Sequence, residues 1–212
     1  MMRVLIADDH PFIRKGIRET LADELGIQQI EEAKDGLEAF DLLTSSSFDL
    51  AIIDISMPGK GGLDLIKDVL ALRPQTRFLV MSVHPEREFA ERAYRNGAMG
   101  YLDKSSPLDE FLGAVRRILC GRRYVSPEYA ELLVLGLDGG SDDEGRLSDR
   151  EFTVLRFCAA GRHLVEIGEE LHLSVKTVST YKTRAMEKLG LGSNAELVAY
   201  AFSHDWLLPP AT

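Results

Sequence analysis

The first 120 residues alternate between short apolar runs and longer stretches in which apolar side chains recur every three or four positions. An uninterrupted apolar run is typical of a strand buried on both faces of a parallel sheet, and the longer pattern is typical of an amphipathic helix. The runs predict strands at residues 3–7, 29–33, 50–54, 78–82 and 100–103. The longer stretches predict helices at residues 11–25, 37–45, 62–72, 86–96 and 108–119.

This regular alternation of strands and helices indicates an α/β domain, in which a parallel sheet is covered by helices on both faces. Because connections between parallel strands are right-handed, few strand orders remain, and the flavodoxin-like order 2-1-3-4-5 is the leading one. In that order the first and third strands are neighbours. The residues that follow these two strands should therefore meet at one edge of the sheet.

Residues 147–212 show only the helical period and predict an all-α domain of four helices, at 149–160, 164–171, 175–189 and 195–203. Ser148 and Glu151 form the pattern of a capping box, in which each side chain bonds the other residue's backbone amide. Ser174 can cap the third helix, and Gly190 stands where that helix should end. The domain is thus expected to be short, helical and well delimited.

Residues 121–146 are predicted to link the two domains. A short helix is expected near residues 127–135, because a proline stands in its first turn. The following stretch, GLDGGSDDEG, is rich in glycine and acids and has no apolar anchor, which favours a mobile hinge at 136–146. The expected organisation is a first domain at 1–120, a linker at 121–146 and a second domain at 147–212.

Composition and charge narrow the class of protein. The content of 45% hydrophobic and 28% charged residues is that of an ordinary globular protein. No stretch reaches the roughly 18 apolar residues that span a bilayer, and the start MMRVLIADD does not look like a signal peptide, so a cytoplasmic protein is expected. The net charge of −9 disfavours indiscriminate nucleic-acid binding, but residues 174–189 carry four basic side chains against one acid. Cys120 and Cys158 are expected to be small core residues without a function.

Three aspartates follow two of the predicted strands. Asp8 and Asp9 follow the first strand, and Asp54 ends the third. Carboxylates this close together repel one another unless a hard divalent cation lies between them, and an all-oxygen ligand set favours Mg²⁺ over zinc. The same cation would shield a phosphoryl group that approaches a carboxylate nucleophile, and aspartate is a known phosphoryl acceptor.

Over roughly residues 1–120 the sequence resembles the receiver domain of two-component response regulators. The residues that carry the resemblance are the Asp8-Asp9 pair, Asp54 with Met57-Pro58 after it, Ser82, and Lys104 in GYLDKS. The resemblance implies that Asp54 accepts a phosphoryl group from a histidine kinase or a phosphotransfer protein. It further implies that Mg²⁺ is the cofactor, held by Asp8, Asp9, Asp54 and the backbone carbonyl of Ser56.

Two further residues of the predicted site follow the fourth and fifth strands. The ammonium group of Lys104 would offset the carboxylates and pair with a phosphoryl oxygen, and Ser82 would donate a hydrogen bond to another. Tyr101 stands where receiver domains carry a rotating aromatic side chain, which implies that it turns inward as a switch when Ser82 moves. For His84 we expect a side chain in solvent, although it could also face the site.

Roughly residues 146–205 resemble the LuxR-type helix-turn-helix of response regulators in the NarL/FixJ group. The matching residues are Leu147, Arg150-Glu151, Val154-Leu155, Gly161, Glu166-Ile167, Leu171, Ser174, Thr177-Val178 and Lys188-Leu189-Gly190. Gly168 departs from this pattern, which usually has alanine there, and is expected to cost its helix up to about 1 kcal/mol relative to alanine.

Residues 175–189 are predicted to be the helix that enters the major groove of DNA. Val178, Ala185 and Leu189 share its inward face. Hydroxyls and a lysine on the outward face suit base edges, and these are Ser179, Thr180, Lys182 and Thr183. Phosphate contacts, which position a helix without reading sequence, are expected from Lys176, Thr177 and Lys188.

The function that we expect is a phosphorylation-dependent transcriptional regulator, which is no enzyme apart from the turnover of its own aspartyl phosphate. Phosphorylation would promote a homodimer that binds promoter DNA. Leu197, Ala201 and their neighbours on the last helix are expected at the dimer contact, although some of them are also expected to close the core of the small domain. One alternative is a regulator that binds DNA or protein without phosphorylation. The other is an aspartyl-phosphate phosphatase, which Ser56 disfavours because such enzymes usually have a second aspartate there.

Overall fold

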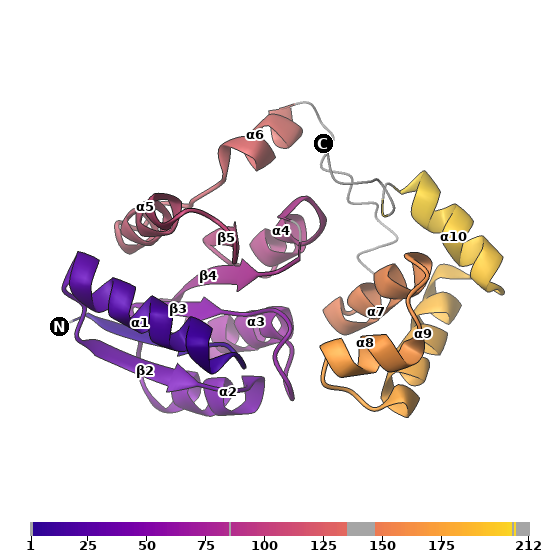
Figure 1. Cartoon of the computed structure of the whole chain (residues 1–212), viewed down its shortest axis with the longest axis horizontal. Coiled ribbons are helices and arrows are strands. Elements are labelled where there is room, and N and C mark those ends of the chain that lie inside the picture. Colours follow the sequence, from indigo (N-terminus) through magenta and orange to yellow (C-terminus); the bar gives the residue numbers. More distant parts are fainter. Residues whose placement is uncertain (1, 85, 135–146, 205, 207–212) are drawn as a thin grey trace. The chain divides into compact units, whose positions relative to one another are not determined.

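The computed structural model describes residues 2–84, 86–134, 147–204 and 206 (Figure 1). The chain divides into two compact units, Met1–Val134 and Leu135–Thr212, each of which is described by itself. The hinge predicted at 136–146 lies outside the described residues. No helix in the described part of the chain is long and apolar enough to cross a membrane.

The first unit is built on a five-stranded parallel sheet in the order β2-β1-β3-β4-β5. The strands are β1 (Arg3–Ala7), β2 (Gln29–Ala33), β3 (Leu50–Ile53), β4 (Arg77–Ser82) and β5 (Gly100–Asp103). The flavodoxin-like order predicted from the sequence is confirmed. Strand β3 ends one residue earlier than predicted, so Asp54 lies just beyond the strand.

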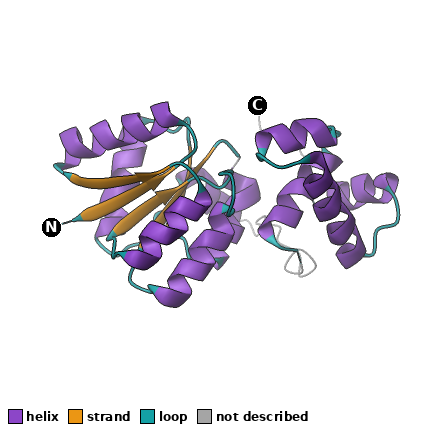
Figure 2. Cartoon of the chain, turned by 90° about the horizontal axis from the view of Figure 1, so that it is seen from below, coloured by secondary structure: helices purple, strands orange, loops and turns teal. Residues whose placement is uncertain are grey.

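Helices cover both faces of the sheet (Figure 2). They are α1 (Pro11–Leu25), α2 (Gly36–Ser45), α3 (Gly62–Leu72), α4 (Glu86–Arg95) and α5 (Leu108–Leu119). Helices α1 and α5 pack on one face, where Leu21 and Val115 join strand residues such as Ile6 and Ile52 in one apolar cluster. Helices α2, α3 and α4 lie on the other face. Because both faces are covered, every residue of β3 is buried, as the uninterrupted apolar run predicted.

A further helix, α6 (Pro127–Val134), follows α5 and belongs to the same compact unit. Its first turn contains the proline that suggested a short helix in this region, and the hydroxyl of Ser126 accepts a hydrogen bond from the amide of Tyr129 at 3.0 Å. Helix α6 contacts α4. The segment expected to be a linker therefore begins with a helix docked on the first domain.

The second unit contains α7 (Asp149–Ala159), α8 (Leu164–Glu170), α9 (Val175–Leu189) and α10 (Asn194–Ser203), which confirms the predicted all-α domain. The capping box is also confirmed, since Ser148 Oγ accepts from the Glu151 amide and Glu151 Oε2 accepts from the Ser148 amide at 2.8 Å. The core of this unit is a cluster of apolar side chains from α7, α8 and α9, namely Val154, Ile167, Leu171 and Val178.

The structure corrects the role expected for α10. Leu197 and Ala201 are buried inside the unit, where α10 packs on α7, so they are not at a dimer contact. The exposed apolar side chains of α10 are those of Val198 and Phe202, and the latter is 72% exposed. Any contact of α10 with a second copy must therefore use this other face.

Two smaller expectations also change. A β-carbon at Gly168 would lie 2.7 Å from the carbonyl oxygen of Leu173, so the turn after α8 passes closer to this helix than a side chain at residue 168 would allow without a shift. This close approach offsets the expected propensity cost of glycine. Both cysteines are free, and Cys120 is exposed rather than in the core.

Candidate functional site

Asp8 and Asp54 lie side by side at the carboxyl edge of the sheet. Ala7 of β1 pairs with Ile53 of β3, and the amide of Asp54 donates to the carbonyl of Ala7 at 2.8 Å. The two residues are only 2% and 3% exposed. The prediction that these strands bring the carboxylates together is therefore confirmed, and the site is a buried acidic pocket.

Lys104 closes this pocket from the end of β5. Its Nζ lies 2.6 Å from Asp8 Oδ2 and 2.8 Å from Asp54 Oδ2, and its side chain is almost fully buried. Burial raises the pKa of Asp54, and Asp8 adds to this, while Lys104 opposes it. Burial alone would lower the pKa of Lys104, but the two carboxylates outweigh it, so this pKa is raised and the ammonium stays charged.

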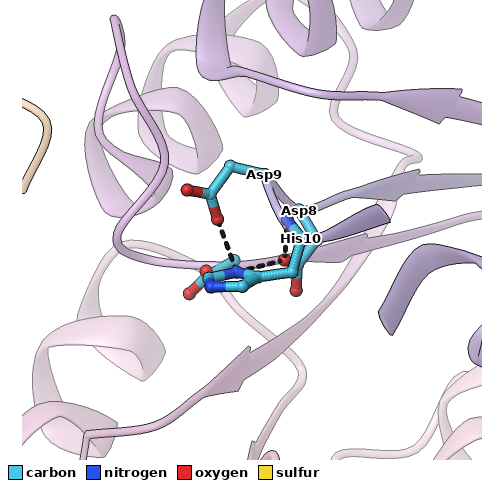
Figure 3. A group of neighbouring side chains, drawn as sticks. Asp8, Asp9 and His10 are labelled. Atoms are coloured by element: carbon cyan, nitrogen blue, oxygen red, sulfur yellow. Dashed lines mark hydrogen bonds and ion pairs between the residues drawn. The ribbon is translucent and has the colours of Figure 1, made fainter. Parts of the chain in front are cut away.

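His10 is a neighbour of the pocket that the sequence analysis missed. Figure 3 shows its ring against both acids, with Nδ1 at 3.1 Å from Asp8 Oδ1 and 2.7 Å from Asp9 Oδ1. Ligand atoms of Asp8, Asp9, His10 and Asp54 all lie within 4.8 Å of one another. The position of His10 directly after the Asp8-Asp9 pair was the sequence signal that could have identified it.

The donor atoms of this pocket suit a hard divalent cation. Three carboxylates converge on one point, and Ser56 is held beside them because its amide donates to Asp54 Oδ1 at 3.1 Å. Oxygen ligands from carboxylates, carbonyls and water are those that Mg²⁺ prefers. The residues present therefore fit the group that the acidic pattern suggested.

Ser82 and Tyr101 lie on the other side of the pocket, and both are fully buried. Ser82 Oγ accepts a hydrogen bond from the His84 amide at 3.1 Å, and the Tyr101 hydroxyl donates to the His84 carbonyl at 2.8 Å. Tyr101 is therefore turned inward in this structure. Burial, above all other causes, raises the pKa of its hydroxyl well above the usual value, which keeps this group a hydrogen-bond donor.

The expectation for His84 was wrong. Its side chain is buried, with Nε2 2.7 Å from the hydroxyl of Ser56 and its ring stacked on Phe89 of α4. It is Val83, one residue earlier, that faces solvent. The β4–α4 connection thus contacts the acidic pocket through His84.

Because residue 62 is Gly62, helix α3 can begin close to the backbone of Asp54 in the acidic pocket. A β-carbon there would lie 2.3 Å from the carbonyl oxygen of Asp54, a separation that no side chain tolerates. Any larger residue would displace the backbone that carries Asp54. This close approach explains one glycine of the PGKGG stretch.

The second unit presents an open groove of about 730 Å³ on helices α8 and α9. It is lined by Leu164, Val175, Lys176, Ser179, Thr180, Thr183, Arg184 and Glu187. The inward face of α9 is formed by Val178 and Ala185, as predicted. The groove is therefore on the opposite, solvent-facing side of the helix, where short hydroxyls lie between two basic side chains.

Comparison with known proteins assigns each unit to a family. The response regulator receiver domain family matches residues 4–116, and the luxR family of bacterial regulatory proteins matches residues 145–201. Response regulator GacA of Pseudomonas aeruginosa is 35% identical over 96% of this chain and 97% of its own length. The Fimbriae Z protein of Salmonella typhimurium is 37% identical over 96% and 98%. The chain is a response regulator of the NarL/FixJ group.

A solved structure of another response regulator is similar to both domains of this chain. RcsB from Salmonella enterica serovar Typhimurium, bound to promoter rprA in the presence of the phosphomimetic BeF3⁻, is 30% identical and has a TM-score of 0.64. The similarity extends over 94% of this chain and 97% of that one. The response regulator therefore combines a receiver domain with a LuxR-type DNA-binding domain.

Not all expected DNA contacts of the response regulator lie on the groove. Lys176, Ser179, Thr180 and Thr183 line it. Lys182 does not; its charge acts on Cys158 of α7, which places it on the flank of α9 nearer that helix. Thr177 is partly buried at the start of α9, where its Oγ1 lies 2.7 Å from Ser174 Oγ.

Lys188 and Arg184 also differ from expectation. The ammonium group of Lys188 forms an ion pair with Glu151 Oε2 at 2.6 Å, so it is engaged within the domain. Arg184, which the sequence analysis left out, lines the groove and is exposed. The helical wheel of α9 contained this signal, because residues 176, 180, 183 and 187 surround position 184 on the face opposite Val178.

Proposed function

We propose that this response regulator is switched by transfer of a phosphoryl group to Asp54. The observation that carries the proposal is the buried contact of Lys104 with both Asp54 and Asp8. A buried carboxylate needs a compensating charge to remain a nucleophile, and Lys104 supplies one without occupying both oxygens.

In this proposal Mg²⁺ is held by Asp8, Asp9, Asp54 and the backbone carbonyl of Ser56. When bound there, the cation would offset the negative charge of the phosphoryl oxygens. An Asp54 oxygen attacks phosphorus, the bond from phosphorus to the histidine nitrogen of the donor breaks, and that nitrogen keeps the electron pair. Lys104 and Ser82 then pair with phosphoryl oxygens, and the inward position of Tyr101 accompanies the movement of Ser82.

The donor in this proposal is a histidine kinase or a phosphotransfer protein. Exposed apolar side chains follow four strand ends around the pocket, and the most exposed, at 88%, is that of Phe12 at the start of α1. The others are Leu37, Val83 and Leu108. Exposed apolar side chains that gather at one end of a domain are typical of a protein-docking surface.

The docking surface can be tested with Phe12→Ala. Uptake from acetyl phosphate should stay unchanged, while transfer from autophosphorylated histidine kinases, screened one by one, should slow at least about tenfold for the true donor. Leu72→Ala is the control, because Leu72 is also apolar and exposed, at 61%, but lies at the end of α3, away from the carboxyl ends of the strands. Equal rates for wild type and Phe12→Ala with every kinase would contradict this surface.

The output in this proposal is binding of promoter DNA by a phosphorylated homodimer through the groove on α9. The similarity to RcsB, which was solved bound to promoter DNA, supports DNA binding by this chain. The basic side chains of Lys176 and Arg184 on the groove suit contact with phosphates. A lone reader helix contacts few base pairs, so a dimer on two half-sites is needed for specificity.

Asp54 itself gives the direct test. Asp54→Asn should abolish phosphoryl uptake from acetyl phosphate with Mg²⁺ and keep the fold, since the amide has the same shape but is a poor nucleophile. Asp9→Ala should raise the Mg²⁺ concentration needed for uptake. Intact-mass and peptide mass spectrometry decide the question, and a phosphoryl group on Asp54→Asn protein, or on any other residue of the wild type, would overturn the proposal.

A further inference from the structure

Helix α6 is anchored to the receiver domain by a partly buried hydrogen bond between side chains. Ser126 Oγ lies 2.5 Å from Glu86 Oε2, at the first residue of α4. The same hydroxyl caps α6 by accepting from the amide of Tyr129. Ser126 and Tyr129 are both almost fully buried. One hydroxyl therefore holds the start of α6 and the start of α4 together.

A group of tyrosines reinforces this contact. The hydroxyl of Tyr94 on α4 donates to the carbonyl of Tyr124 at 2.9 Å, and its ring centroid lies 5.9 Å from that of Tyr129 on α6. The hydroxyl of Tyr124 donates to Glu110 of α5 at 2.6 Å. The segment that leads out of the receiver domain is thus packed against both α4 and α5.

The same stretch of backbone reaches the acidic pocket. His84, two residues before Glu86, contacts Ser56 through its ring and accepts from the Tyr101 hydroxyl through its carbonyl. Phe89 of α4 stacks on that ring, with centroids 4.9 Å apart. Ser82 and Tyr101 both bond the backbone of His84, so a movement of either acts on a residue only two positions from Glu86.

We propose that Glu86 and Ser126 form a latch that couples the Asp54 site to helix α6, the first element of the interdomain segment. This inference rests on the proposed function for its input, which is phosphorylation of Asp54. In the closed latch α6 is docked on α4 and Tyr101 is inward, which is the arrangement in this structure. Phosphorylation, by drawing in Ser82 and holding Tyr101 in this inward position, favours the closed latch.

The surroundings of Glu86 make the latch sensitive to protonation. Its Oε1 is buried and has no hydrogen-bond partner among the described residues. The polar and charged groups around it come from every neighbouring element, and they are Tyr94, Tyr101, Glu110, Tyr124, Ser126, Glu128 and Tyr129. Burial first, and then the acids Glu110 and Glu128, raise the pKa of Glu86 to about 7, although Ser126 opposes the shift.

The sign of the pH effect follows from this shift. Burial is the main cause of the raised pKa of Glu86, which is about 7 in the closed latch. Undocking of α6 that exposes this carboxylate should lower its pKa towards 4.5, so the closed latch should bind more protons than the open one between these values. Docking is strongest below pH 4.5 and weakens as the pH rises to about 7, above which it stays at its weakest. Near neutral pH the docking of α6 is therefore close to its weakest, and a small stabilisation from the Asp54 site can close the latch.

Hydrogen–deuterium exchange of residues 127–134 in the full-length chain tests the latch. At pH 7.5, Glu86→Gln should slow this exchange at least about tenfold relative to wild type, because the amide is neutral and keeps an acceptor for Ser126. At pH 5.5 the two proteins should converge. Ser126→Ala should speed exchange at both pH values. Glu131→Gln, an equal charge change at an exposed position of α6, is the matched control and should behave as wild type.

Beryllofluoride with Mg²⁺ serves as the phosphoryl mimic in the second arm. It should slow exchange of residues 127–134 in wild type and have little effect on them in Ser126→Ala. Equal exchange in wild type and Glu86→Gln at pH 7.5, or an equal change in Glu131→Gln, would overturn the latch. A response at residues 54–62 without one in α6 would overturn the coupling alone. If neither residues 54–62 nor residues 127–134 respond to beryllofluoride, the proposed function fails. The comparison of wild type with Glu86→Gln at the two pH values then supports or overturns the latch by itself.

Discussion

Two basic residues of α9 that look equivalent in the sequence have different surroundings. Lys182 is partly buried on the flank of the helix, whereas Arg184 is exposed and lines the groove with Lys176. A cation contributes to DNA affinity only where it can reach a phosphate or a base edge. Position on the helix surface, rather than charge alone, should therefore decide which of them contacts DNA.

Salt-dependent binding to a mixed-sequence duplex can distinguish them. Arg184→Ala and Lys176→Ala should each weaken binding and reduce the slope of log affinity against log salt by about 1. Lys182→Ala, which removes an equal charge two residues away, is the matched comparison and should leave the slope nearly unchanged. A loss of about 1–3 kcal/mol for Lys182→Ala at particular base pairs only would instead restore it as a base reader.

Residues of the acidic pocket could be predicted from the sequence where their position followed from strand order alone. Asp8, Asp54 and Lys104 each follow a strand, so the topology brought them together. His84 and Glu86 could not be predicted in this way, because they lie in and just after a connection whose path depends on tertiary packing. A buried histidine next to a proline has no signature in the pattern of hydrophobic and polar positions.

At the scale of elements, the start of α7 and the end of α9 are held together by one carboxylate. Glu151 accepts from the Ser148 amide in the capping box and also pairs with Lys188. Burial would raise the pKa of Glu151, but the hydrogen bonds from Lys188 and Ser148 outweigh it, so the pKa is lowered below 4.5. A lowered pKa means that Glu151 stabilises the fold above pH 4.5 and that this stabilisation is lost as the pH falls further.

Glu151→Gln should therefore destabilise the second unit by about 1–2 kcal/mol at pH 7, and the difference should shrink below pH 4.5. Denaturant unfolding followed by the fluorescence of Trp206, the only tryptophan, reports this unit, because the indole packs edge-on against Phe152 of α7. Glu169→Gln on exposed α8 is the control. A difference that stays constant down to pH 3 would show that the ion pair is not its source.

The ends of the helices and strands were largely predictable from the sequence. The elements that each of them packs against were less predictable. The period of apolar residues placed every strand and helix within about one residue of its observed ends, since burial on one or both faces follows directly from that period. The same period could not tell which partner covers a face. Leu197 and Ala201 have the spacing of a dimer seam, yet they pack on α7.

At the scale of the whole molecule, the exposed face of α10 is the part of this helix that remains available for self-association. With Leu197 and Ala201 buried, Val198 and Phe202 remain exposed one turn apart. We expect Phe202→Asp to weaken phosphorylation-dependent dimerisation at least about tenfold while the domain stays folded. Val165→Asp on α8, another exposed apolar position, is the matched control.

Sedimentation of the full-length chain with and without beryllofluoride and Mg²⁺ measures this effect. Wild type and Val165→Asp should shift towards the dimer, and Phe202→Asp should remain monomeric at the same concentration. Dimerisation of Phe202→Asp with unchanged affinity would place the contact between copies elsewhere, for example on the receiver domain.

The assembly of the acidic pocket from four strands has a consequence for biosynthesis. Asp54 and Lys104 are 50 residues apart in the chain, and the ammonium that compensates the carboxylates arrives with the last strand. At about 5–20 residues per second, translation needs on the order of several seconds to pass from one to the other. During that interval the nascent chain already carries its aspartates but has no pocket around them. A chain that ends before Lys104 therefore has the aspartates but lacks the ammonium group that compensates their charge.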